Sequence, residues 1–304
     1  MLATMMLAAS CGSDGFDDEL QNVTDNESPQ EIRLKADVWR MMEGTRATTY
    51  DNQAALQTAG HFTCAVYQEN TTTSYIDATT VDWNGSTAWE FTDGKHYWPM
   101  SGNLDFFAYM PATKPDYISS ITYAVSGDPA TPHPYFVCAN LPMTNDGQSS
   151  SLKEFVYALT KGQSKAAQGA SGVTMNFSHP FARVKFVLSA ASGTNVKVNS
   201  ITIPNLYTGG TYTDGTGWES LTGDVSLAIS GNPATGDTFY LVVPNNYGTK
   251  TFTVNATWDD WSVVTKNVSA DVTVNWQAGY SYTYTFTLSK YALKVDVAKY
   301  TEQW

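Results

Sequence analysis

Residues 280–289 read Tyr-Ser-Tyr-Thr-Tyr-Thr-Phe-Thr-Leu-Ser, and this stretch decides the fold class. Every second side chain is large and apolar, and each residue between them is Ser or Thr. Because successive side chains of a strand point to opposite faces of a sheet, the pattern predicts a strand with one buried and one solvated face. A further candidate strand with the same period, carrying Leu293, Val295 and Val297, follows it.

The same period of two recurs in both halves of the chain, and short turn sequences such as Asn84-Gly85 separate the runs. The clearest runs place apolar residues at alternate positions: Phe62, Cys64 and Val66; Leu104, Phe106, Ala108 and Met110; Val184, Phe186 and Leu188; Phe252, Val254, Ala256 and Trp258. Aromatic residues reach 13% and charged residues only 15%, a composition that suits half-buried sheets. With no helical pattern between the strands, the sequence predicts an all-β chain of two tandem antiparallel β-sandwich domains.

Changes in composition divide the chain into four parts. We expect a lipoprotein signal peptide at 1–11, an acidic flexible tether or pro-segment at 12–46, an N-terminal sandwich at 47–168 and a C-terminal sandwich at 169–304. The boundary between the sandwiches falls in a stretch rich in Ser, Gly, Gln and Ala that offers no residue able to anchor a core. Residues 151–159, just before it, fit either a strand or a short helix.

Cys11 follows a short apolar run and the small residues Ala8, Ala9 and Ser10. A signal peptidase admits small side chains next to the bond that it cuts, and the thiol that follows can be acylated. The pattern therefore predicts that Cys11 is the lipidated first residue of an exported lipoprotein, against the alternative of an idle cysteine near the terminus. No other apolar run is long enough to span a bilayer, so we expect membrane attachment through lipid alone.

The formal net charge of −12 is concentrated near the N-terminus. Seven acids precede Arg33, the first basic residue, and without them the formal charge falls to −5: Asp14, Asp17, Asp18, Glu19, Asp25, Glu27 and Glu31. Phosphate binding requires a basic patch, so the composition excludes nucleic acid as a partner.

The sequence carries no pattern that indicates catalysis. The four histidines are scattered, with no metal-ligand or nucleophile-base spacing: His61, His96, His133 and His179. No phosphate loop, dinucleotide fingerprint or hydrolase motif is present. We therefore expect a protein that is not an enzyme and that has no metal, no cofactor and no catalytic residue. Cys64 and Cys138 fit a disulfide or two buried thiols equally well.

Four sets of residues, in this order, resemble the signatures of one known family. They are His96-Tyr97-Trp98-Pro99 with Leu104 to Pro111; Met175 to Phe186, which contains Phe177, His179, Ala182 and Arg183; Phe239 to Pro244; and Trp276-Gln277-Ala278-Gly279 with Tyr282-Thr283-Tyr284. Together they resemble the fimbrillin family of the Bacteroidales, the subunits and accessory proteins of type V fimbriae.

This resemblance implies a lipoprotein of the outer membrane or the cell-surface fimbrium with transthyretin-like sandwiches. It also implies that an arginine-specific or trypsin-like protease removes the N-terminal segment, so that a strand from another subunit can fill the exposed groove. Arg46, followed by Ala47, stands where that cleavage would fall, although Arg33 and Arg40 compete with it. The partners implied are other fimbrial subunits, the outer membrane through the lipid, and a host or bacterial surface ligand.

An incoming strand satisfies unpaired backbone groups and fills an apolar trough at once. The candidate donor strand is C-terminal, with Leu293, Val295 and Val297 as the side chains that fill the pockets. The alternative is that this segment is the last strand of its own domain.

The nine tryptophans support a rival function, a glycan-binding outer-membrane surface lipoprotein, because aromatic rings stack on sugar faces. The residues that would carry it are Trp83, Trp89, Trp218 and Trp261. Two coplanar, exposed rings would favour it, and buried rings would count against it.

Overall fold

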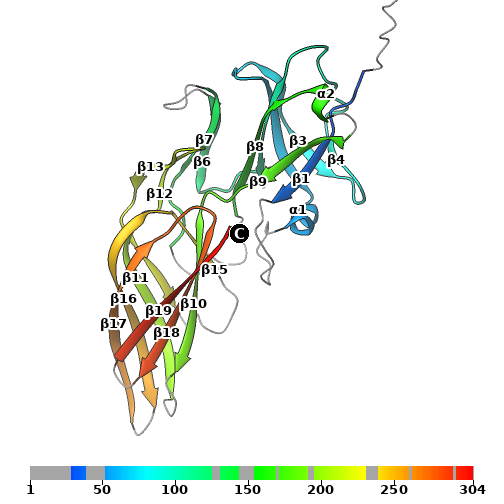
Figure 1. The fold of residues 1–304 in the computed structure, drawn as a ribbon. Helices are drawn as coiled ribbons and strands as arrows, with labels where there is room; N and C mark the ends of the chain where they lie inside the picture. The colour runs from blue at the N-terminus through cyan, green and yellow to red at the C-terminus, as the bar shows by residue number, and fades with distance from the viewer. Residues whose placement is uncertain are drawn as a thin grey trace, which may run out of the picture.

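The computed structural model describes residues 29–38, 52–124, 131–143, 154–168, 171–190, 195–230, 239–259, 262–289 and 292–303. These residues form an N-terminal module around a seven-stranded sheet, a C-terminal β-sandwich, and a four-stranded sheet that joins the two (Figure 1). The prediction of an all-β protein built from antiparallel β-sandwiches is confirmed. In the described part of the chain, no helix is long and apolar enough to cross a membrane.

The N-terminal sheet consists, in spatial order, of β8 (Val156–Gln163), β5 (Leu104–Met110), β2 (His61–Gln68), β3 (Ser74–Trp83), β4 (Trp89–Phe91), β1 (Leu34–Val38) and β9 (Val173–Phe177). All neighbours are antiparallel except β1 and β9, which run parallel. The two outer strands meet, because Tyr157 and Ser178 exchange backbone hydrogen bonds of 3.1 and 2.7 Å. The sheet therefore curls around one apolar core.

Two short helices accompany this sheet, α1 (Gln53–Ala59) and α2 (Lys165–Gln168). The side chain of Asn52 caps α1 by accepting a hydrogen bond of 2.9 Å from the backbone of Ala55. Leu56 of α1 is fully buried in the core of the sheet, and α1 packs beside β1. The helix therefore covers one end of the curled sheet.

The C-terminal sandwich packs two sheets around one core. One sheet contains β15 (Phe239–Val242), β10 (Ala182–Ala190), β18 (Tyr280–Ser289) and β19 (Ala292–Gln303); the other contains β14 (Val225–Ser230), β11 (Val196–Leu206), β16 (Asn246–Asp259) and β17 (Val263–Asn275). Tyr282, Tyr284 and Phe286 of β18 are buried, as their alternation predicts. The ring of Phe252 on β16 lies 5.1 Å from that of Tyr284, so aromatic contacts join the two layers.

The joining sheet takes strands from both halves of the chain: β13 (Gly217–Thr222), β12 (Gly209–Thr213), β7 (His133–Cys138) and β6 (Ile118–Ala124). β12 from the second half pairs antiparallel with β7 from the first. Beneath them, Phe136 and Phe155 of the first half share a core with Phe181 and Leu241 of the second. The halves are thus connected by backbone hydrogen bonds and a common core.

Two segments lie elsewhere than the sequence predicts. Residues 34–38 form the paired strand β1 inside the expected flexible tether 12–46, so the tether prediction fails for them. The sequence did not predict this strand because its apolar stretch is short. Its three apolar residues, Leu34, Ala36 and Val38, alternate with charged residues. β9 follows the boundary expected at 168/169 and yet pairs within the N-terminal sheet. Of the two alternatives for 151–159, the structure has the start of strand β8.

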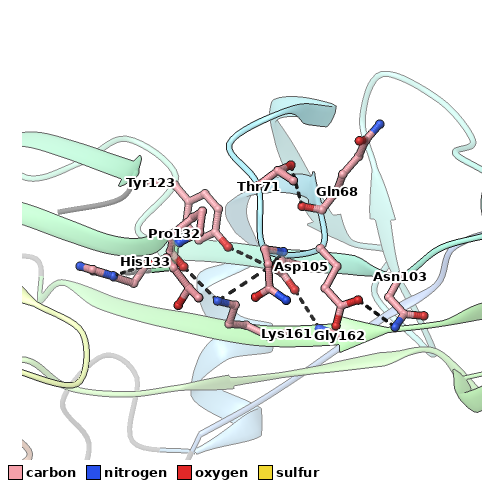
Figure 2. Close-up of polar contacts among 12 residues, drawn as sticks. Gln68, Thr71, Asn103, Asp105, Tyr123, Pro132, His133, Lys161 and Gly162 are labelled. Carbon is pink, nitrogen blue, oxygen red and sulfur yellow. Dashed lines mark hydrogen bonds and ion pairs between the residues drawn. The ribbon is translucent and has the colours of Figure 1, made fainter. Parts of the chain in front are cut away.

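Asp105 is fully buried at the start of β5, where its carboxylate connects several segments (Figure 2). Oδ1 accepts a hydrogen bond of 2.8 Å from the backbone N–H of Gly162. Oδ2 accepts one of 2.9 Å from the backbone of Asn70 and one of 3.1 Å from the Tyr123 hydroxyl, and the Lys161 Nζ lies 3.9 Å away. Burial and this carboxylate raise the pKa of Tyr123. The cluster fastens the N-terminal sheet to the joining sheet.

We expect Asp105→Ala to lower the free energy of unfolding by at least about 3 kcal/mol, because it leaves buried donors without their charged acceptor. Urea denaturation measures the change. The matched control is Asp271→Ala, which removes an exposed carboxylate that accepts a hydrogen bond of 2.7 Å from the Thr251 hydroxyl. It should cost less than about 1 kcal/mol. Equal losses for both variants would contradict the structural role of Asp105.

Candidate functional site

The segment 30–38 fills a gap in the N-terminal sheet, which we call the β1 slot. On one side β1 pairs in parallel with β9 over five residue pairs, from Leu34 with Val173 to Val38 with Phe177. The backbone N–H of Val173 also donates to the carbonyl of Arg33 at 2.8 Å. This wall of the slot is therefore bonded along the whole strand.

The other wall of the slot is formed by β4 and by residues 96–98. β1 pairs with β4 only at Leu34 and Trp89. Before that point, the N–H of Ile32 donates to the carbonyl of His96 at 2.8 Å, and the N–H of Trp98 donates to the carbonyl of Gln30 at 2.9 Å. The segment is thus hydrogen-bonded on this side up to Leu34 and to β9 from Arg33 onward, which places it in the interior of the sheet.

The side chains of the segment alternate strictly between core and solvent. Ile32, Leu34, Ala36 and Val38 are buried in the N-terminal core, whereas Arg33, Lys35 and Asp37 are exposed. Burial of each large apolar side chain stabilises the fold by about 1.5–3 kcal/mol. An empty slot would therefore expose an apolar trough between two unpaired strand edges, which is a binding site for another strand.

Gly172 holds the segment closely at the start of β9. Its φ of +80° lies in the left-handed region, and a Cβ at this position would lie 2.9 Å from the carbonyl oxygen of Arg33. A larger residue would push against the backbone of the segment. The fit of the segment in the slot therefore depends on this glycine.

Arg46, Ala47 and Cys11 lie outside the described residues, as does Arg40. The structure describes the chain up to Val38 and again from Asn52, so Arg46 falls between β1 and α1 in the sequence. Arg33, by contrast, lies within the paired segment.

The candidate donor residues lie on β19, which pairs antiparallel with β18 over ten residue pairs. Leu293 and Val295 are half-buried against the C-terminal core, and Val297 is 43% exposed. β19 is an edge strand of its described sheet. The three side chains therefore lie on a strand that, within this sheet, is paired on one side only, with β18.

The two described cysteines, Cys64 on β2 and Cys138 on β7, are free, buried thiols. They belong to different cores. Burial raises the pKa of Cys64, and it raises the pKa of Cys138 to about 12. Of the alternatives open from sequence, the structure has two buried thiols and no disulfide between them.

The described tryptophans of interest pack into cores. Trp89 is buried, and Trp83 is half-buried and tilted by 52° to it. The indole N–H of Trp218 donates to the carbonyl of Pro180 at 2.6 Å, and Trp261 lies outside the described residues. Among the described residues these rings form no coplanar exposed pair, so nothing in their geometry favours a glycan site.

The histidines do not form a metal site in the described part of the chain, where no group of three or more His, Cys, Asp or Glu residues is placed to hold an ion. His179 is buried between the N-terminal sheet and β10. Its Nδ1 lies 2.7 Å from Oε1 of Glu154. This position agrees with a structural role for His179.

Comparison with known proteins places the chain in a family. The sequence model of the fimbrillin-like family matches residues 45–304, which is most of the chain. The protein therefore belongs to the fimbrillin-like family, and the resemblance found in the sequence motifs is confirmed. No curated protein sequence matches the chain.

Solved structures share this fold. A fimbrial protein from Bacteroides vulgatus has a TM-score of 0.62 at 16% identity, covering 89% of this chain and 98% of that one. A proposed cell adhesion protein from Bacteroides ovatus has a TM-score of 0.53 at 16% identity, covering 90% and 96%. Another from Bacteroides uniformis has a TM-score of 0.52 at 18% identity, covering 89% and 98%. At these identities the likeness concerns the fold.

We expect Gly172→Ala to loosen the segment 30–38 selectively, because the new methyl group collides with the backbone of Arg33. Hydrogen exchange at the amide of Ile32 should become at least about tenfold faster. Gly215→Ala is the matched control, since Gly215 has a φ of +81° and open space at its Cβ. It introduces the same backbone strain without the collision. Equal exchange at Ile32 in both variants would show that Gly172 does not hold the segment.

Proposed function

We propose that this protein is a subunit of a surface fimbria, or a fimbrillin-like surface adhesin, that assembles by strand complementation after proteolysis. The observation that supports the proposal most directly is the β1 slot, because an N-terminal segment supplies a hydrogen-bonded, half-buried strand that is not continuous with its neighbours in sequence. Cleavage after the segment would let it leave and let a strand from another subunit replace it. The protein would thus act by binding and not by catalysis.

Arg46 is the cleavage site that fits this role. A protease must bind the extended backbone around the bond that it cuts, and at Arg33 that backbone is already bonded to β9. Arg46 lies after β1 and before α1, so a cut there separates the segment from the module without breaking any hydrogen bond of the described sheet. The new N-terminus would be Ala47.

β19 is the donor strand that the proposal assigns to each subunit. Its apolar residues Leu293, Val295 and Val297 alternate as Leu34, Ala36 and Val38 do in the slot. Leaving β18 would cost hydrogen bonds and burial, and entry into the slot would supply both again. Transfer of β19 from its place beside β18 to the β1 slot of another subunit therefore requires only a small net gain in free energy.

The proposal extends to how the chain is divided and where it is held. It keeps the division into sandwiches at 47–168 and 169–304, with β9 returning to the first. Lipidation at Cys11 would bring the protein to the outer membrane and, through assembly, to the fimbrium. A host or bacterial surface ligand would be a further partner of such an adhesin.

The cleavage proposal predicts one discrete product. Limited trypsin treatment of the full chain should yield a fragment that begins at Ala47, identified by mass spectrometry. After removal of the N-terminal segment, the fragment should bind a labelled peptide of residues 30–38. A peptide of residues 292–303 should compete with it, because both present alternating apolar side chains.

Two variants control this experiment. Arg46→Gln should abolish the product and the peptide binding, whereas Arg40→Gln should change neither. A fragment that binds no peptide would refute strand complementation, and competition only by residues 30–38 would remove β19 as the donor.

The anchor proposal predicts that Cys11→Ala releases the protein from membranes, because without the thiol no acyl chain can be attached. Fractionation of cells that express each form measures the membrane-bound share. Cys138→Ala is the control, since a buried thiol is no target for acylation. Retention of the Cys11→Ala variant in the membrane would contradict the anchor.

A further inference from the structure

The last strand, β19, ends at the same end of the C-terminal sandwich at which the chain enters it. The first strand of this sandwich, β10, has Arg183 near its start, beside Ser281 of β18. Ser281 in turn pairs with Tyr300. Tyr280, one residue earlier, pairs with Gln303, the last residue of β19. Figure 1 accordingly marks the C-terminus close to where the two halves of the molecule meet.

At the opposite end of the sandwich β18 ends and β19 begins, since Ser289 pairs with Ala292. We call this the far end, and the end that holds Arg183 and Gln303 the entry end. β10 and β18 run parallel over eight residue pairs, whereas β18 and β19 run antiparallel. β19 therefore leads the chain from the far end back to the entry end.

The attachment of β19 weakens toward the entry end. Leu293 and Val295, near the far end, are half-buried against the C-terminal core. Beyond them, Asp296, Val297 and Ala298 are all exposed. In the described sheets β19 pairs only with β18, and β17 of the other layer lies beside it without pairing. The part of β19 at the entry end is therefore held mainly by backbone bonds to one strand.

We propose that β19 is a strap that peels off β18 from its C-terminal end when the molecule is stretched between its two termini. Force on the C-terminus is directed away from the N-terminal module, so it draws the end of β19 back over the sandwich toward the far end. The hydrogen bonds of an antiparallel pair are perpendicular to the strands, so this force reaches them one pair after another. The behaviour belongs to the single chain and does not require strand exchange.

The remaining strands of this sheet meet the same force in a different way. After β19 has peeled, β18 receives the force at the far end, while β10 is held at the entry end, where it joins the first half. Because these two strands are parallel, their eight residue pairs must give way together. Peeling should therefore stop at the far end and leave the core of the sandwich folded.

Stretching single molecules of the full chain in optical tweezers tests the strap. With handles at the two termini, the first extension step should occur at a lower force than every later step. It should lengthen the molecule by about 80 Å, because the attachment point moves by the length of the twelve-residue strand and the freed residues add that length again. The step should reverse when the force is lowered, because the rest of the sandwich stays folded.

The matched control moves the second handle to the far end, through the thiol of the variant Ser289→Cys. Both molecules carry Cys11→Ser, and the buried thiols of Cys64 and Cys138 accept no handle. β18 is then stretched directly against β10, so the early step should be absent. The same early step in both molecules would overturn the inference. So would unfolding of the first molecule without an early step, or with one much longer than β19 alone can supply.

Discussion

An interior strand must satisfy its backbone on two sides at once, and the N-terminal module depends on how the segment 30–38 meets this requirement. β9 bonds to residues 33–38 of this segment, while residues 96–98 and β4 bond to its first part, up to Leu34, on the opposite side. Its apolar side chains belong to the same core as Phe62 and Phe106, so it is part of the interior. In the sequence, however, the segment is adjacent to neither of the strands that it pairs with, β4 and β9. A module whose closure depends on a separable piece of chain is suited to exchange that piece.

The rest of the molecule keeps that module in a defined relation to the second half. The joining sheet pairs β12 with β7, and its core combines Phe136 with Phe181. Asp105 adds buried hydrogen bonds to the β8 backbone and to Tyr123 of the joining sheet. Linkers between independent domains provide no such connections. In a subunit of a fibre, these contacts would keep a strand-accepting module and a strand-donating edge at a constant separation.

Much of the fold could be predicted from sequence, because strands such as β18, β5 and β16 each bury one face and so alternate clearly. β1 could not, since Arg33, Lys35 and Asp37 dominate a short stretch next to an acidic tail. The joining sheet escaped prediction because pairing of β7 with β12 depends on distant segments and not on local pattern. The β1 slot could not be predicted for the same reason, because its walls contain Trp89 and Val173, which are distant from the segment 30–38 in the sequence. Arg46 could be singled out only through the family resemblance.

The parallel pairing of β1 with β9 has a mechanical consequence. A pull on whatever strand occupies the slot acts along the strand axis, so the bonds to β9 and to the opposite wall must slide past one another together and cannot open one by one. Because β9 leads within a few residues into β10, tension would pass directly from the first half to the second. A filament linked in this way would resist drag in flowing liquid by sharing load across many weak bonds.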